Sequence, residues 1–139
     1  MDDRFQLRRF VEAQQPIYET VRGELRAGRK RGHWMWFIFP QIAGLGHSAM
    51  ATKFALLSLD EAVAYLAHSV LGQRLLECSA LVASVDRRSI EEIFGHPDDI
   101  KFHSSMTLFS KAAPEEPIFA GCLQKYFGGE PDPLTLARL

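Results

Sequence analysis

The segment Trp34–Phe39 most constrains the fold, because it places two tryptophans and two phenylalanines within six residues. Such rings bury large apolar areas, and a buried indole N–H group needs a hydrogen-bond partner. The composition suits a β-strand, but Pro40 follows directly and no second segment of similar character is present to pair with it. We therefore expect this segment to fill the core of a helical domain.

Apolar and large residues recur every three to five positions through the first 27 residues, which is the spacing of a helical face. Proline is best tolerated in the first turn of a helix, so Pro16 divides this region. The pattern predicts one helix over about 3–14 and a second over about 16–27, with Gly28 as its C-terminal cap.

The rest of the chain carries signals for helix starts and stops at short intervals. Serine and aspartate cap helix N-termini, proline suits a first turn, and glycine ends a helix. The predicted starts are Ser48, Ser58 or Asp60, Ser69, the capping box at Ser89, His96-Pro97-Asp98, Pro117 and Asp132. The sequence thus predicts an all-α fold: a single compact orthogonal helical domain of about 6–8 short helices over residues 1–139.

The formal net charge of −1 gives no overall field that would favour nucleic acid or an anionic membrane as partner. Cys78 and Cys122 are the only cysteines and form no CxxC pair, so we expect no disulfide or zinc framework and a reducing, cytoplasmic location. The acidic start Met1–Arg4 is in the wrong order for a secretory signal. No apolar run of 18 residues is present, so we expect no membrane span.

Polar residues flank the aromatic segment and suggest a second interpretation, in which the segment forms one wall of a binding pocket. His33 can donate, accept or titrate near neutrality, and Gln41 offers an amide donor and acceptor. The loop 44–48, with Gly44, Gly46 and Ser48, leads into a predicted helix whose N-terminus could hold an anion. The loop is neither a GxGxxG nor a GxSxG motif.

A basic cluster of Arg26, Arg29, Lys30 and Arg31 precedes the aromatic segment. Positive charge next to stacking rings is the mixture used by proteins that bind single-stranded nucleic acid. Cations are also favourable at the C-terminus of a helix, where this cluster is predicted to lie. The helix end explains most of the cluster, so the sequence favours a structural role for these residues over a nucleic-acid partner.

A second polar cluster follows Asp98. If the segment is helical, Lys101 meets Ser104 and Ser105 on one face, and a neutral lysine could act as base for a serine nucleophile. The alternative is structural: Asp98 caps the helix and pairs with Lys101, while the serines permit close helix packing.

Four residues of this region, His96, Asp98, Asp99 and His103, are of metal-ligating types. Their spacing on one helix matches no ligand geometry that can be justified. We therefore expect no metal and no cofactor.

The sequence resembles, over essentially its whole length, a family of bacterial all-helical domains of unknown function that often carries the automatic label "calpastatin". The resemblance rests above all on the segment 33–41 and extends to Arg9-Phe10, Ala13-Gln14, Tyr18, Lys30, Gly44-Leu45-Gly46, Ser48, Tyr65-Leu66, Leu71-Gly72, Asp99, Lys101, Ser104–Phe109, Gly129, Asp132 and Thr135. It implies a single helical domain and no particular activity. Calpain inhibitors act through an extended disordered segment, so we expect no protease inhibition.

Two function hypotheses follow. The first is binding, or hydrolysis, of a small phosphorylated or nucleotide-like ligand in a cleft beside residues 33–48. The small helical fold that cleaves N-glycosidic bonds of ADP-ribose compounds is an analogue in architecture only. The candidate catalytic residues are His33, Lys101 and Ser105, and the candidate ligand-binding residues are Trp34, Trp36, Gln41, Gly44, Gly46, Ser48, Asp99 and Ser104. The second hypothesis is a non-enzymatic module that binds a protein or another copy of itself.

Overall fold

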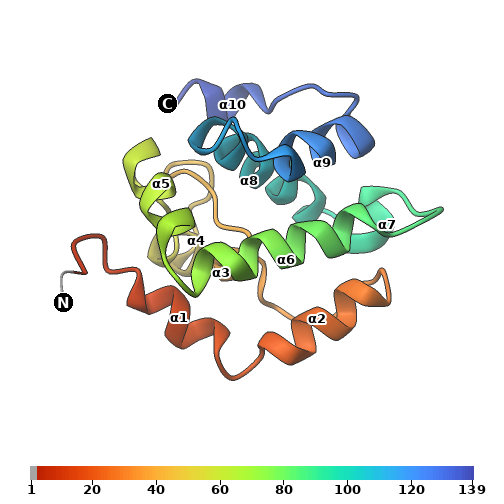
Figure 1. Ribbon diagram of the computed structural model, residues 1–139, viewed down its shortest axis with the longest axis horizontal. Helices are drawn as coiled ribbons and strands as arrows, with labels where there is room; N and C mark the ends of the chain where they lie inside the picture. The colour runs from red at the N-terminus through yellow and green to blue at the C-terminus, as the bar shows by residue number, and fades with distance from the viewer. Residues whose placement is uncertain (1–2) are drawn as a thin grey trace.

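The computed structural model describes residues 3–139, which form ten helices and no β-strand (Figure 1). The helices are α1 (Arg8–Gln14), α2 (Tyr18–Arg26), α3 (Met35–Ile38), α4 (Ala49–Lys53), α5 (Leu59–Ala67), α6 (Leu71–Ala83), α7 (Ile90–Phe94), α8 (Asp98–Ala112), α9 (Pro117–Phe127) and α10 (Pro133–Leu136). The predicted all-α fold is confirmed. The number exceeds the expected six to eight because α3, α4, α7 and α10 have only four or five residues each.

Helix α6 runs through the middle of the domain in Figure 1, with α1 and α2 forming an open V on one side and α8, α9 and α10 on the other. It contacts α2, α5 and α9, while α8 contacts α5, α7, α9 and α10. Helices α2, α5, α7, α9 and α10 are therefore arranged around α6 and α8, while α1 packs on α3. None of the helices described in residues 3–139 is long and apolar enough to cross a membrane.

Side-chain caps begin several helices where the sequence predicts them. The hydroxyls of Ser48 and Ser58 accept hydrogen bonds from backbone N–H groups three residues later. Ser89 and Glu92 form the complete capping box of α7, and the Asp132 carboxylate caps α10. These starts are confirmed because each depends only on residues within one helical turn.

Two predicted helix starts are wrong. Helix α1 begins later than residue 3, because the Asp3 carboxylate accepts hydrogen bonds from the N–H groups of Leu7 (2.7 Å) and Arg8 (3.1 Å). Helix α6 is capped by the Nδ1 atom of His68 and not by Ser69; this ring nitrogen accepts from the two N–H groups that open the helix, at 3.1 and 3.3 Å.

The aromatic segment fills the centre of the domain, as the sequence predicts. Its middle forms the single turn α3, and every side chain from Trp34 to Phe39 is buried except that of Trp36. The Phe39 ring meets the rings of Phe94 and Phe102 edge to face, with centroids 5.8 and 5.0 Å apart. Such aromatic pairs add to the stability gained from area burial alone.

The carboxylate of Glu24 ties the aromatic segment to α2. Its Oε1 atom accepts hydrogen bonds from the backbone N–H groups of Arg31 (2.7 Å) and Gly32 (2.9 Å) and from the indole N–H of Trp34 (2.9 Å). Partial burial would raise the pKa of Glu24, but these donors and the charge of Lys30 outweigh it and lower the pKa. The buried indole thereby has the partner that it needs.

A loop follows the aromatic segment and is closed by two backbone hydrogen bonds. The Leu56 N–H donates to the Gln41 carbonyl at 3.0 Å, and the Ala43 N–H donates to the Leu56 carbonyl at 2.8 Å. They form an isolated parallel bridge between Ile42 and Leu56. The bridge holds the loop 44–48 and α4 against the end of α3.

We expect Glu24→Gln to lower the free energy of unfolding at pH 7 by about 1–3 kcal/mol, because a neutral amide oxygen accepts the three donors less strongly. The folded state lowers the pKa of Glu24, so its contribution is present above the unfolded-state pKa and is lost as the pH falls through the folded-state pKa. Urea unfolding at pH 7 and pH 3 should therefore show a deficit at pH 7 that shrinks at pH 3. The control is Glu12→Gln, which removes only an exposed pair with Arg8; an equal loss in both variants, or a deficit unchanged by pH, contradicts the assignment.

Candidate functional site

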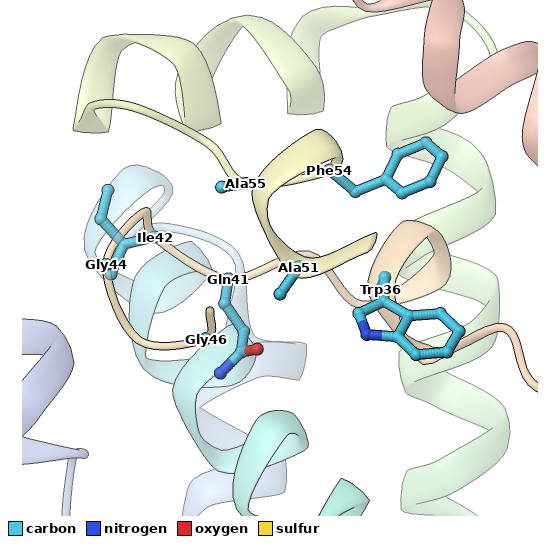
Figure 2. Close-up of a pocket in the computed structure, with 8 residues that line it drawn as sticks. All are labelled: Trp36, Gln41, Ile42, Gly44, Gly46, Ala51, Phe54 and Ala55. Carbon is cyan, nitrogen blue, oxygen red and sulfur yellow. The ribbon is translucent and has the colours of Figure 1, made fainter. Parts of the chain in front are cut away.

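A narrow hollow opens on the surface beside the aromatic segment (Figure 2). It is enclosed by α3, the loop after it and α4, and it holds about 10 Å³, room for about one water molecule. We call it the Trp36 hollow. Its lining contains four of the predicted ligand-binding residues, Trp36, Gln41, Gly44 and Gly46, together with Ile42, Ala51, Phe54 and Ala55.

The structure separates the two tryptophans that the sequence offered as stacking residues. Trp34 is only 3% exposed and its indole N–H donates to Glu24, so it belongs to the core. Trp36 is partly exposed and lines the hollow, and Figure 2 shows its indole nitrogen on the side of the ring toward Gln41. This nitrogen has no hydrogen-bond partner within residues 3–139, in contrast to that of Trp34.

The backbone of Gln41 helps to close the loop, and its side chain lines the hollow. Its carbonyl accepts from Leu56, whereas its amide lies beside Gly46 in Figure 2. Within the part of the chain that the structure describes, this amide has no hydrogen-bond partner. A side chain with an unused donor and acceptor is suited to a polar ligand.

Lys101, in the first turns of α8, does not line the hollow but lies against the ring of Trp36, which does. Its ammonium group lies 5.3 Å from the centroid of the Trp36 ring, within the range of a cation–π interaction. Asp98 Oδ1 is 3.5 Å from this ammonium, and Asp98 Oδ2 is 2.8 Å from that of Lys30. The two ammonium groups share Asp98, and the Glu24 carboxylate also lies near Lys30. Lys101, at the longer distance from Asp98, is thus the less tightly paired of the two lysines.

Arg138 lies against the loop at Gly44 and is a residue that sequence reasoning missed. Gly44 has a φ of +96°, which favours glycine, and a β-carbon there would collide with the Arg138 guanidinium. Among residues 3–139, Arg138 forms no ion pair. Arg138 lies in the turn after α10, and its charge is the only signal that the sequence offers, since 94 positions separate it from Gly44.

Three further predicted residues do not line the hollow. His33 is exposed just before α3. The Ser48 hydroxyl accepts from the Ala51 N–H at 3.1 Å and caps α4. Asp99 pairs with the Nδ1 atom of His96 at 3.0 Å.

The two serines of α8 face the interior. The Ser104 hydroxyl donates to Asp132 Oδ2 at 2.9 Å, and the same oxygen accepts from the Thr135 N–H (3.2 Å) and hydroxyl (2.6 Å). Ser105 is fully buried, and its hydroxyl has no hydrogen-bond partner. The structure therefore does not join Ser105 to Lys101, the pair that the sequence offered as nucleophile and base.

No group of three or more His, Cys, Asp or Glu side chains within residues 3–139 is placed to hold a metal ion. Of the four residues considered for one, Asp98 pairs with lysines and His96 with Asp99. The His103 ring stacks on that of Phe127 with centroids 4.0 Å apart. Each of these side chains thus has a local structural partner.

The two cysteines are also buried. Both thiols are free, and burial raises the pKa of Cys78 and of Cys122 to about 12. A thiol with so high a pKa is a poor nucleophile at neutral pH.

Among known protein families, the one described as "Protein of unknown function (DUF1810)" matches residues 4–139 of the chain. The chain belongs to the DUF1810 family. The resemblance to a family of domains of unknown function is thus confirmed. The description of DUF1810 makes no mention of calpastatin.

The DUF1810 chain is similar to the conserved hypothetical protein Rv1873 from Mycobacterium tuberculosis, which was solved by crystallography at 1.38 Å. The two are 58% identical over 99% of this chain and 98% of that one, with a TM-score of 0.97. They therefore share the fold over nearly their full lengths. The curated proteins include no match to the chain.

The adjacent serines of α8 give a matched pair of variants in this DUF1810 domain. We expect Ser104→Ala to lower the free energy of unfolding by about 1–3 kcal/mol, because it removes a buried donor from Asp132. Ser105→Ala should be neutral or slightly stabilising, because its hydroxyl has no partner to lose. Urea unfolding measures both, and an equal cost for the two variants contradicts the assignment.

Proposed function

We propose that this DUF1810 domain binds a small anionic ligand of the phosphorylated or nucleotide-like class at the Trp36 hollow. The observation that carries the proposal is the Lys101 ammonium over the ring of Trp36, a residue that lines the hollow together with the Gln41 side chain. Sites for small ligands characteristically combine an aromatic surface with a few polar groups that fix orientation.

The charges around the hollow favour an anion. Asp98 is shared between Lys30 and Lys101, so it positions Lys101 without cancelling the charge of both lysines. Arg138 adds a guanidinium against the Gly44 side of the loop. The N–H donors of Trp36 and Gln41 can bind phosphate or carboxylate oxygens between these cations.

The size of the hollow limits what enters it. Pockets that enclose whole small molecules measure about 300–1,000 Å³, whereas the hollow itself holds only about 10 Å³, room for about one water molecule. We infer that the ligand lies across the mouth of the hollow and does not fill it. A flat ring of the ligand would then lie on the exposed part of Trp36, with its anionic group near Lys101.

The proposal is limited to binding. General acid–base and nucleophilic catalysis need a side chain within reach of the reacting atoms. Ser105 is fully buried, and His33 is not among the residues that line the hollow. Neither residue therefore supports a hydrolytic step in this site.

The test is a titration with adenosine 5′-monophosphate, ribose 5-phosphate and adenosine, followed by thermal unfolding and by tryptophan fluorescence. We expect the two phosphorylated compounds, but not adenosine, to raise the melting temperature, because a ligand that binds only the folded state stabilises it. Lys101→Ala should weaken binding at least about tenfold, the effect of losing roughly 1.4 kcal/mol. Trp36→Phe should abolish the fluorescence response.

The matched control is Lys111→Ala, which removes an exposed lysine from the other end of α8. Equal loss of binding in the Lys101 and Lys111 variants contradicts the assignment. Absence of any response to all three compounds would favour the non-enzymatic module instead. For that alternative, Leu57 and Val63, 77% and 45% exposed, offer apolar surface around the start of α5.

A further inference from the structure

Five exposed arginines gather where α2 ends and α7 begins. They are Arg26, Arg29 and Arg31 from the end of α2 and the turn after it, and Arg87 and Arg88 from the turn before α7. The two turns lie side by side (Figure 1): a β-carbon on Gly28 would be 3.3 Å from the Cδ atom of Arg88, and the Lys30 N–H donates to the Ile93 carbonyl at 2.7 Å. We call these five residues the arginine surface.

The arginine surface carries an excess of positive charge. Within residues 3–139, none of its five guanidinium groups forms an ion pair, whereas Arg8, Arg9 and Arg22 on α1 and α2 do. Several carboxylates lie nearby: Asp86 is in the same turn as Arg87 and Arg88, and Glu91 and Glu92 are in the first turn of α7. Hydrogen bonds from Ser89 and the charge of Arg88 lower the pKa of Glu92. These acids offset part of the charge of the five arginines.

Helix ends do not account for the cations that follow α2. A helix dipole favours positive charge within the last turn and its effect falls off beyond it. That explains Arg26, which is the last residue of α2. Arg29 and Arg31 lie three and five positions further on, and their side chains have no structural role of this kind.

Arg87 and Arg88 are still less expected from the fold. They precede the N-terminus of α7, where the helix dipole is positive and opposes cations. At the end of α6, the carbonyls of Ala83 and Val85 already accept hydrogen bonds from Lys125 Nζ at 2.6 and 2.7 Å. Arg87 also has a φ of +63°, in the left-handed region that favours glycine.

We propose that the arginine surface binds the phosphate backbone of single-stranded nucleic acid. Guanidinium groups present a planar fork of donors that matches phosphate, and a row of them gives binding that does not depend on sequence. Lys30, which lies between Arg29 and Arg31 in the sequence, pairs with Asp98, and Asp98 contacts Lys101 beside the Trp36 ring. A partly exposed indole at that place suits stacking of an unpaired base.

Other polyanions fit the arginine surface less well. Membrane-bound surfaces combine cations with apolar side chains that enter the lipid, and residues 26–31 and 84–89 contain no exposed large apolar side chain. An acidic protein would meet the charge but leave the nearby Trp36 unused. The five arginines lie outside the Trp36 hollow, so their variants test this proposal separately from small-ligand binding there; only Trp36 is common to both proposals.

The test is fluorescence anisotropy with a fluorescein-labelled 12-nucleotide oligothymidylate and the full chain. Contacts with about five phosphates on a single strand give a slope of about −3.5 for log K against log salt concentration. We therefore expect affinity to fall roughly 100-fold between 50 and 200 mM salt. The double variants Arg29→Gln/Arg31→Gln and Arg87→Gln/Arg88→Gln should each flatten the slope by about 1.4.

The control is Lys53→Gln/Lys111→Gln, which removes two exposed cations outside the arginine surface and should keep the wild-type slope. Thermal unfolding verifies that each variant is folded. The proposal is overturned if the oligothymidylate does not bind at 50 mM salt, or if the control loses as much affinity as the arginine variants. It is also overturned if a labelled 12-residue oligoglutamate, or vesicles containing phosphatidylserine, bind as tightly as the oligothymidylate.

Discussion

Three hydrogen bonds to one oxygen of Glu24 determine how this domain presents its aromatic segment. They turn the chain after α2 and hold the Trp34 indole in the core. A helix rotates by about 100° per residue, so a tryptophan two positions later in the turn points to the other side. The buried position of Trp34 therefore places Trp36 at the surface, where it lines the hollow.

The same turn arranges the charges on both proposed surfaces. It brings Lys30 to Asp98, which in turn contacts Lys101 beside Trp36. It also directs Arg29 and Arg31 outward, next to the turn that carries Arg87 and Arg88. The Lys30–Asp98 pair thus links the segment that carries Arg29 and Arg31 to Lys101 beside Trp36, although each surface is proposed to bind by its own residues.

Local features of the fold could be predicted because they depend on residues within one turn. The capping box of Ser89 and the positive φ of Gly95 that ends α7 are of this kind. The start of α1 could not be predicted, because the Asp3 carboxylate accepts hydrogen bonds from N–H groups four and five positions later, so the helix begins further along the chain. The cap of α6 comes from a histidine, which the usual preferences for N-caps do not include.

The candidate site shows the same division. Trp36 and Gln41 could be found because they belong to one short segment whose composition stands out. Which tryptophan faces outward depends on Glu24, and the contact of Arg138 with Gly44 depends on how the C-terminal turn packs. Ser105 fits a helical pairing with Lys101 by spacing alone, but the packing of α8 encloses its hydroxyl.

The most direct test of the account is the behaviour of the two indole N–H groups in 15N-resolved NMR spectra, with Trp36→Phe to assign them. The account predicts that the Trp34 signal exchanges slowly with solvent and keeps its position when adenosine 5′-monophosphate is added. The Trp36 signal should exchange rapidly and shift during the titration. Rapid exchange of Trp34, or a shift of its signal while that of Trp36 stays fixed, would contradict the division of the segment into a buried anchor and a ligand-facing residue.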